Sequence, residues 1–196
     1  MAPRVLLNGQ TMPRPFIPAV LVLAGALTAG PGRAATLQRL SMDEMIEKST
    51  EIVRGRVMTL GVSTKGSILY TLARVEVTER WKGATAQTVE VWIPGGRSGN
   101  LRQTFSGAPA LAVGSEYVLF LWAGTSGNRQ VIGFSQGAFD VKLDAKGNLQ
   151  MQRSATSETM LDDRGVEVGD VPVRMSLSEL RQKLKSALGP AQGSGE

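Results

Sequence analysis

The chain contains neither cysteine nor histidine among its 196 residues. These two absences exclude a Ser-His-Asp triad, a cysteine nucleophile and a histidine general base. A zinc site would lack its usual nitrogen and sulfur ligands, and haem attachment through C-x-x-C-H is excluded as well. The chemistry that remains is serine–lysine catalysis, acid–base catalysis by paired carboxylates, and cation binding by oxygen atoms.

Aromatic residues are also scarce, at 5% of the chain, whereas glycine occurs 23 times and hydrophobic residues make up 42%. A globular chain with few strong helical patterns and many glycines favours β-structure with frequent turns. No internal repeat of about 20 to 50 residues is present, which argues against a propeller or a solenoid.

A long uncharged run, Phe16–Gly30, stands near the N-terminus. Arg4 and Arg14 precede it, and small residues ending at Ala34 follow it, which is the layout of a secretory signal peptide. The run is short for a membrane span, which needs about 20 apolar residues. We therefore predict a signal peptide over 1–34, with Met12 as an alternative start, and a periplasmic or extracellular protein with no stable membrane span after cleavage.

Removing the signal peptide leaves 19 basic and 17 acidic residues, a net charge of +2. The charge is too small to favour a nucleic-acid partner.

Two capping boxes predict the helices. Ser41 with Glu44 predicts a short helix over 42–49, and Ser176 with Glu179 predicts a C-terminal helix over 176–189. In the second helix, leucines recur at helical spacing until Gly189-Pro190 ends the pattern.

Alternating apolar residues predict strands between the helices, at 50–63, 67–82, 88–94, 115–124 and 149–153, with one or two more within 129–143. Gly55 suggests a bulge in the first of these strands, and Gly133 and Gly137 suggest bulges in a later one. The continuous apolar run within 115–124 suits a central strand buried on both faces, with Trp122 in the core. The fold class that follows is mainly β: a small, bent, antiparallel OB-like barrel with a short N-terminal helix and a C-terminal helix.

The predicted organisation is a signal peptide over 1–34, an OB-like β-barrel domain over 35–153, an irregular polar segment over 154–175, the helix over 176–189 and a flexible tail over 190–196.

Four segments occur in a recognisable order: SMDEMIEKSTEIVRGRV, the strand that closes in VTERWKG, the loop with GGRSGN and FSGAPAL, and VGSEYVLFLWAG ahead of VIGFSQGAFDV. This set, Ser41 to Val141, resembles a family of exported bacterial proteins without assigned activity. It is more distantly similar to the netrin-like domain of tissue inhibitors of metalloproteinases. The resemblance implies an OB-type barrel outside the cytoplasm. Those inhibitors act through an N-terminal cysteine, which this chain lacks.

The glycine-rich stretch Ile93–Leu111 lacks the G-x-x-x-x-G-K-[ST] pattern of a phosphate-binding loop, and Pro109 bars a helix after it. We interpret it as a long connection between barrel strands. Long loops on a rigid barrel often carry recognition. The candidate partner-facing residues are therefore Arg97, Asn100 and Arg102, together with Trp81 and Trp92, which flank a single connection.

Other clusters carry weaker signals. The acidic residues of 154–175 lack calcium-loop spacing and suit a solvated loop. The solvent-exposed face of a sheet is a better explanation than an acid–base pair for Glu76, Glu79 and Glu90. Ser106 lacks the G-x-S-x-G context of a nucleophile. No catalytic, metal or cofactor site is predicted.

The function predicted from the sequence is an exported, non-enzymatic domain that binds a protein or an envelope component through barrel-rim loops. The alternative is an inhibitor or regulator of a secreted peptidase. A carboxylate-dependent hydrolase would need two acidic side chains that converge in a cleft.

Overall fold

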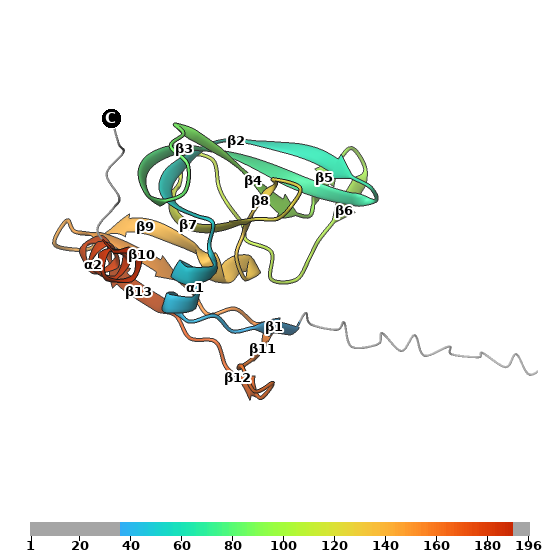
Figure 1. Ribbon diagram of the computed structural model, residues 1–196. Coiled ribbons are helices and arrows are strands. Elements are labelled where there is room, and N and C mark those ends of the chain that lie inside the picture. The colour runs from blue at the N-terminus through green and yellow to red at the C-terminus, as the bar shows by residue number, and fades with distance from the viewer. Residues whose placement is uncertain (1–35, 190–196) are drawn as a thin grey trace, which may run out of the picture. The chain divides into compact units, whose positions relative to one another are not determined.

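A computed structural model of the protein describes residues 36–189 (Figure 1). The predicted signal peptide and the predicted flexible tail lie outside these residues. The elements in chain order are β1 (Thr36–Gln38), α1 (Met42–Lys48), β2 (Glu51–Lys65), β3 (Ile68–Lys82), β4 (Thr88–Pro94), β5 (Gly96–Ser98), β6 (Leu101–Gln103), β7 (Glu116–Ala123), β8 (Arg129–Val131), the 3-10 helix η1 (Phe134–Gly137), β9 (Ala138–Leu143), β10 (Leu149–Arg153), β11 (Thr159–Leu161), β12 (Glu167–Val168), β13 (Val173–Ser176) and α2 (Leu177–Leu188).

The main sheet has eight strands in the order β13-β10-β9-β7-β2-β3-β4-β8, and an additional β7–β8 pairing partly closes it. The ring β7-β2-β3-β4-β8 is closed on one side by a single parallel bridge, Val91 to Arg129, whereas its other pairings are antiparallel. The predicted mainly β, barrel-like fold with two helices is confirmed.

Strand β7 separates two hydrophobic cores. Tyr117, Leu119 and Leu121 belong to the cluster inside the ring. Val118 and Phe120, with the opposite orientation, belong to a second cluster beneath the helices. Because successive side chains of a strand point to opposite faces, an uninterrupted apolar run contributes buried side chains to both cores. The prediction of a central strand buried on both faces is thus confirmed.

The two helices cover the second core, as Figure 1 shows for α2 beside β10 and β13. In both helices the predicted capping box is formed: the serine hydroxyl accepts from the N–H three residues later, and the glutamate accepts from the serine N–H. In α2 the leucines at 177, 180 and 184 are buried. These two helices therefore begin where their sequences predict.

Strand β2 has buried residues on both of its faces. Val53 and Val57 belong to the first core, whereas Ile52 is fully buried in the second core. The expected bulge at Gly55 is confirmed by a register shift between Arg54 and Gly55. A Cβ on Gly55 would lie 2.4 Å from the backbone oxygen of Glu76, so the strands approach too closely for any side chain there.

Three further expectations are wrong. Gly133 and Gly137 are not bulges in a strand. Gly133 directly precedes the 3-10 helix η1 and Gly137 is its last residue, and η1 separates β8 from β9. The segment 154–175 is not irregular throughout, because it contains β11, β12 and most of β13. Trp122 is not in the core: it is 48% exposed, since its side chain leaves β7 near the end of the covered region.

Candidate functional site

The predicted partner-facing loop is a small hairpin. Strands β5 and β6 pair so that Arg97 lies directly opposite Arg102, and Asn100 lies in the exposed turn between them. Like charges at directly opposed positions destabilise a strand pair. Within residues 36–189, no carboxylate forms an ion pair with either arginine. The structure therefore brings together the three predicted loop residues, with two uncompensated positive charges.

The hairpin is held rigidly against the turn between β2 and β3. The Gln103 side chain accepts a hydrogen bond from the Leu69 N–H at 2.7 Å and donates one to the Ser67 carbonyl at 2.8 Å. The Thr71 hydroxyl donates to the Gly95 carbonyl at 2.9 Å. Gly95 has φ of +100°, a conformation that glycine adopts without strain. The glycines of this stretch thus let the chain bend where the hairpin meets the turn between β2 and β3, and this arrangement is not a phosphate-binding loop.

A hollow of about 520 Å³ lies between this hairpin and the loop that follows it, and both Arg97 and Arg102 line it. Thr71, Ile93 and Phe105 contribute to its other walls. The predicted arginines therefore share one concave surface.

The two predicted tryptophans lie far apart. Trp92 packs edge-on against Tyr70, with ring centroids 5.5 Å apart, near the hairpin. It pairs in register with Leu72, nine residues along β3 from Trp81, a separation of roughly 30 Å in an extended strand. Trp81 instead packs against the second core and donates from Nε1 to Glu79 at 3.0 Å. The prediction that both tryptophans lie with the partner-facing loop is therefore wrong for Trp81, and only Trp92 lies near the loop.

Two stretches of the chain that form the hairpin and the adjoining strand ends carry no acidic residue. We define the acid-free tip as residues 58–73 and 91–105; its charged residues are Lys65, Arg97 and Arg102. The tip also exposes large apolar side chains, with exposed fractions between 38% and 56%: Met58, Leu60, Val62, Leu101 and Phe105. The sequence interpretation missed these apolar residues. Their signal was a stretch of β2 from 57 to 64 without any charge.

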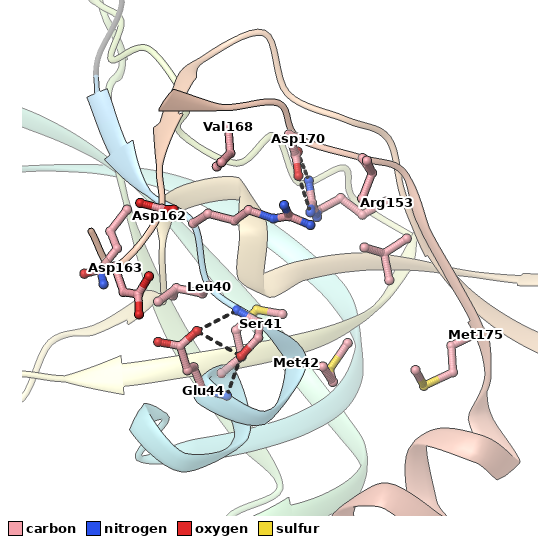
Figure 2. Close-up of a pocket in the computed structure, with 15 residues that line it drawn as sticks. Leu40, Ser41, Met42, Glu44, Arg153, Asp162, Asp163, Val168, Asp170 and Met175 are labelled. Atoms are coloured by element: carbon pink, nitrogen blue, oxygen red, sulfur yellow. Dashed lines mark hydrogen bonds and ion pairs between the residues drawn. The ribbon is translucent and has the colours of Figure 1, made fainter. Parts of the chain in front are cut away.

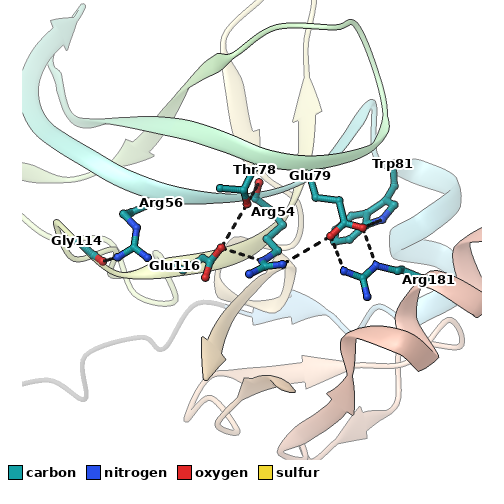
Figure 3. Close-up of polar contacts among 8 residues, drawn as sticks. All are labelled: Arg54, Arg56, Thr78, Glu79, Trp81, Gly114, Glu116 and Arg181. Atoms are coloured by element: carbon teal, nitrogen blue, oxygen red, sulfur yellow. Dashed lines mark hydrogen bonds and ion pairs between the residues drawn. The ribbon is translucent and has the colours of Figure 1, made fainter. Parts of the chain in front are cut away.

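The carboxylates of the opposite region are, in contrast, engaged with arginines (Figure 3). Glu79 accepts two hydrogen bonds from Arg181 of α2, at 2.6 and 2.7 Å, and Arg54 lies between Glu79 and Glu116. The hydrogen bonds from Arg181 hold the pKa of Glu79 below its ordinary value, although burial opposes them. Glu90 lies opposite Arg74 in register and accepts from Trp92. These carboxylates thus serve contacts within the sheet and to α2.

A second hollow, of about 390 Å³, lies between the start of α1 and the segment before β13 (Figure 2). Acidic side chains line it, but three of them already have local partners. Glu44 caps α1, where hydrogen bonds from Ser41 and Lys48 lower its pKa to about 2. Asp162 accepts the N–H groups of a turn at 2.8 and 2.9 Å.

Asp170, in the same hollow, faces Arg153. Burial alone would raise the pKa of Asp170, but contacts with Arg153 and the Thr156 N–H outweigh it and leave the pKa below its ordinary value. No group of three or more acidic side chains within residues 36–189 is arranged to hold a metal ion. The polar wall of this hollow is therefore explained by packing contacts.

Ser106 donates to Glu158 at 3.0 Å, so its hydroxyl links the loop after β6 to the segment before β11. No basic side chain is bonded to this hydroxyl in the described part of the chain. This contact explains Ser106 as a structural residue.

Comparison of the chain with protein-family models, with curated proteins and with solved structures found no match. The class of the protein is accordingly defined by its fold: a mainly β chain with a partly closed eight-stranded sheet and two helices over one core. Among residues 36–189, no helix has the length and apolar character needed to cross a membrane.

Proposed function

We propose that this chain is an exported, non-enzymatic binding domain that contacts an acidic protein or envelope component through its acid-free tip. The observation that carries the proposal is the opposed pair Arg97 and Arg102, which line one hollow and have no carboxylate partner among residues 36–189. An acidic ligand would relieve the repulsion between these arginines, because each guanidinium can then donate to a carboxylate or phosphate.

Export is supported by the sequence pattern that ends at Ala34, and cleavage there is compatible with the described elements. Strand β1 starts at Thr36, two residues after the predicted cleavage site, so removal of 1–34 leaves every described element intact. If export occurs as proposed, mass spectrometry of the protein from its native cells will give an N-terminus at or near Ala35. An intact 1–34 segment on the exported protein would contradict this part of the proposal.

The binding part is tested by capture of partners from envelope and culture-fluid fractions of the native cells. The bait variants are the wild type, the double variant Arg97→Glu/Arg102→Glu, and the control Arg164→Glu, whose side chain is 80% exposed on a distant turn. We expect a specific set of partners with the wild type and the control, lost with the double variant and weakened by salt. Identical capture by all three baits would refute binding through the hairpin. An activity assay on any captured peptidase then tests the alternative role as a peptidase regulator.

A further inference from the structure

Half of strand β2 has a neighbour on only one side. The strand has 15 residues, but β7 pairs with it only from Glu51 to Arg56. The last backbone contacts on that side join Val57 to Gly114 and Ser115. Beyond them, residues 58–65 pair with β3 alone among the described residues, and Figure 1 shows this part of β2 with no strand along its outer side. We call residues 58–65 the free edge.

The backbone groups that point outward from the free edge follow from the register. The N–H of Leu69 donates to Gln103 and its carbonyl accepts from Gly95, so Leu69 faces away from β2. In an antiparallel pair, a residue opposite such a position also points its N–H and C=O away from its partner strand. Thr64 is opposite Leu69, and the uninterrupted register gives Val62 and Leu60 the same orientation. Three residues thus present backbone donors and acceptors that have no partner in the part of the chain that the structure describes.

The side chains of the free edge are exposed as well. Every residue of 58–65 except Ser63 is exposed, with Leu60 at 40% and Val62 at 47%. Natural edge strands are usually protected by charges, prolines or bulges. Here a bulge at Met58 and the charge of Lys65 stand only at the two ends. The six residues between them form an unprotected template for strand addition.

Charge argues against a second copy of the chain as the added strand. Antiparallel self-pairing centred on Gly61 would place Lys65 of each copy beside Val57 and Arg56 of the other. It would also bring two acid-free tips together, with no carboxylate to separate their arginines. An acidic strand meets the opposite situation, because β5, which carries Arg97, contacts both β2 and β3.

We propose that an extended peptide segment with alternating apolar and acidic residues adds to the free edge as an extra strand. Its backbone pairs with Leu60, Val62 and Thr64, and its apolar side chains cover Leu60 and Val62. Its carboxylates lie on the opposite face, on the side of Lys65, and the hairpin arginines add positive charge to the same tip. This mode of recognition combines backbone hydrogen bonds with side-chain selection. It rests on the proposed function and specifies the partner of the same tip.

The probe is a fluorescently labelled ten-residue peptide of alternating valine and glutamate, with a valine–lysine peptide as its charge control. Binding to the purified, signal-cleaved protein is measured by fluorescence anisotropy. The key variant is Val62→Pro, which removes an outward N–H but no bond to β3. Its matched control is Val62→Thr, which keeps the N–H and the branched shape.

We expect the valine–glutamate peptide to bind the wild type and Val62→Thr equally, and Val62→Pro at least about tenfold more weakly, since a backbone hydrogen bond is lost and the proline ring obstructs pairing. The valine–lysine peptide should not bind. An unchanged unfolding temperature of Val62→Pro confirms that the β2–β3 hairpin is intact.

Amide hydrogen exchange gives a second readout with an internal control. The amides of Leu60, Val62 and Thr64 should exchange rapidly in the free protein and become protected when the peptide is added. The amides of Gly61 and Ser63, which bond to β3, should be protected in both states. This alternation is specific to strand addition.

Several results would overturn the inference: no binding of the valine–glutamate peptide up to about 1 mM, equal binding by Val62→Pro, or no change in the three exposed amides. A dimer of the wild type that Val62→Pro abolishes would assign the free edge to a second copy instead. Binding to phosphatidylglycerol vesicles that depends on Leu60 and Val62 would assign it to a lipid surface.

The outcome also separates this inference from the proposed function. If peptide binding is lost in Arg97→Ala/Arg102→Ala but kept in Val62→Pro, the basic hairpin binds its partner without strand addition. If only Val62→Pro loses the peptide, while native partners are captured equally by all hairpin variants, strand addition stands and the hairpin proposal fails.

Discussion

The two halves of strand β2 contrast sharply in their surroundings. From Glu51 to Val57 the strand lies between β3 and β7, with only Arg56 exposed, and Glu51 pairs with Arg80 and Arg129. From Met58 to Lys65 it pairs with β3 alone among the described residues, exposes apolar side chains and carries no acidic residue. The first half is therefore built for stability, and the second half is available for contacts with another molecule.

The largest expected effect concerns the buried carboxylate at the start of β2. Glu51→Gln leaves Arg80 and Arg129 without their negative partner, and we expect the free energy of unfolding to fall by about 3 kcal/mol. Arg97→Ala, at the tip, removes one of two opposed like charges and should change stability by less than about 0.5 kcal/mol. Urea unfolding of both variants checks this difference. Equal losses of unfolding free energy in the two variants would contradict the contrast between the start of β2 and the tip.

A smaller effect is expected from the two glycines of β2. A Cβ on Gly55 would lie 2.6 Å from the Val75 Cγ1 and still closer to the β3 backbone, whereas a Cβ on Gly61 finds its nearest atoms at 4.0 Å. We expect Gly55→Ala to cost about 2 kcal/mol or more, because the strands must separate. Gly61→Ala should be neutral or slightly stabilising. Thermal unfolding of the two variants measures this, and a destabilised Gly61→Ala would show that the free edge is packed against something.

The smallest effect concerns pH. The pKa of Glu79 is lowered in the folded protein, chiefly by hydrogen bonds from Arg181, so this pair stabilises the fold at neutral pH. That contribution is lost as the pH falls through the ordinary glutamate pKa of about 4 towards the folded value. Because the pair is partly exposed, we expect Arg181→Gln to cost about 0.5–1 kcal/mol at pH 7 and less at pH 3.

Urea unfolding of the wild type and Arg181→Gln at the two pH values provides the measurement. A constant difference between them would contradict the assignment. The free edge gives the matching negative control, since the tip has no carboxylate and its amide chemical shifts should stay constant over this range.

Many elements were predictable because their determinants are local. The strand 88–94 has the predicted bounds, both capping boxes form, and the run at 115–124 is a central strand. Each of these patterns depends on residues within a few positions of one another. The hairpin residues Arg97, Asn100 and Arg102 were predicted for the same reason, from a loop bounded by recognisable strands.

Other features depend on contacts between distant parts of the chain. Strand β11 exists because it pairs with β1, more than 100 residues away, so its sequence looked irregular. Trp122 continues an apolar run, and only the extent of the covering layers determines that it is exposed. The hydrogen bonds of the Gln103 side chain likewise depend on the position of the turn between β2 and β3, which is distant in sequence.

The sequence alone determined the excluded chemistry, the mainly β fold and the basic character of the hairpin, because these follow from composition, alternation and residue type. Only the tertiary structure decided that Arg97 and Arg102 oppose each other and that half of β2 has no outer neighbour within residues 36–189. The lengths of paired strands and the register between them are set by long-range packing, which no local pattern of residues encodes.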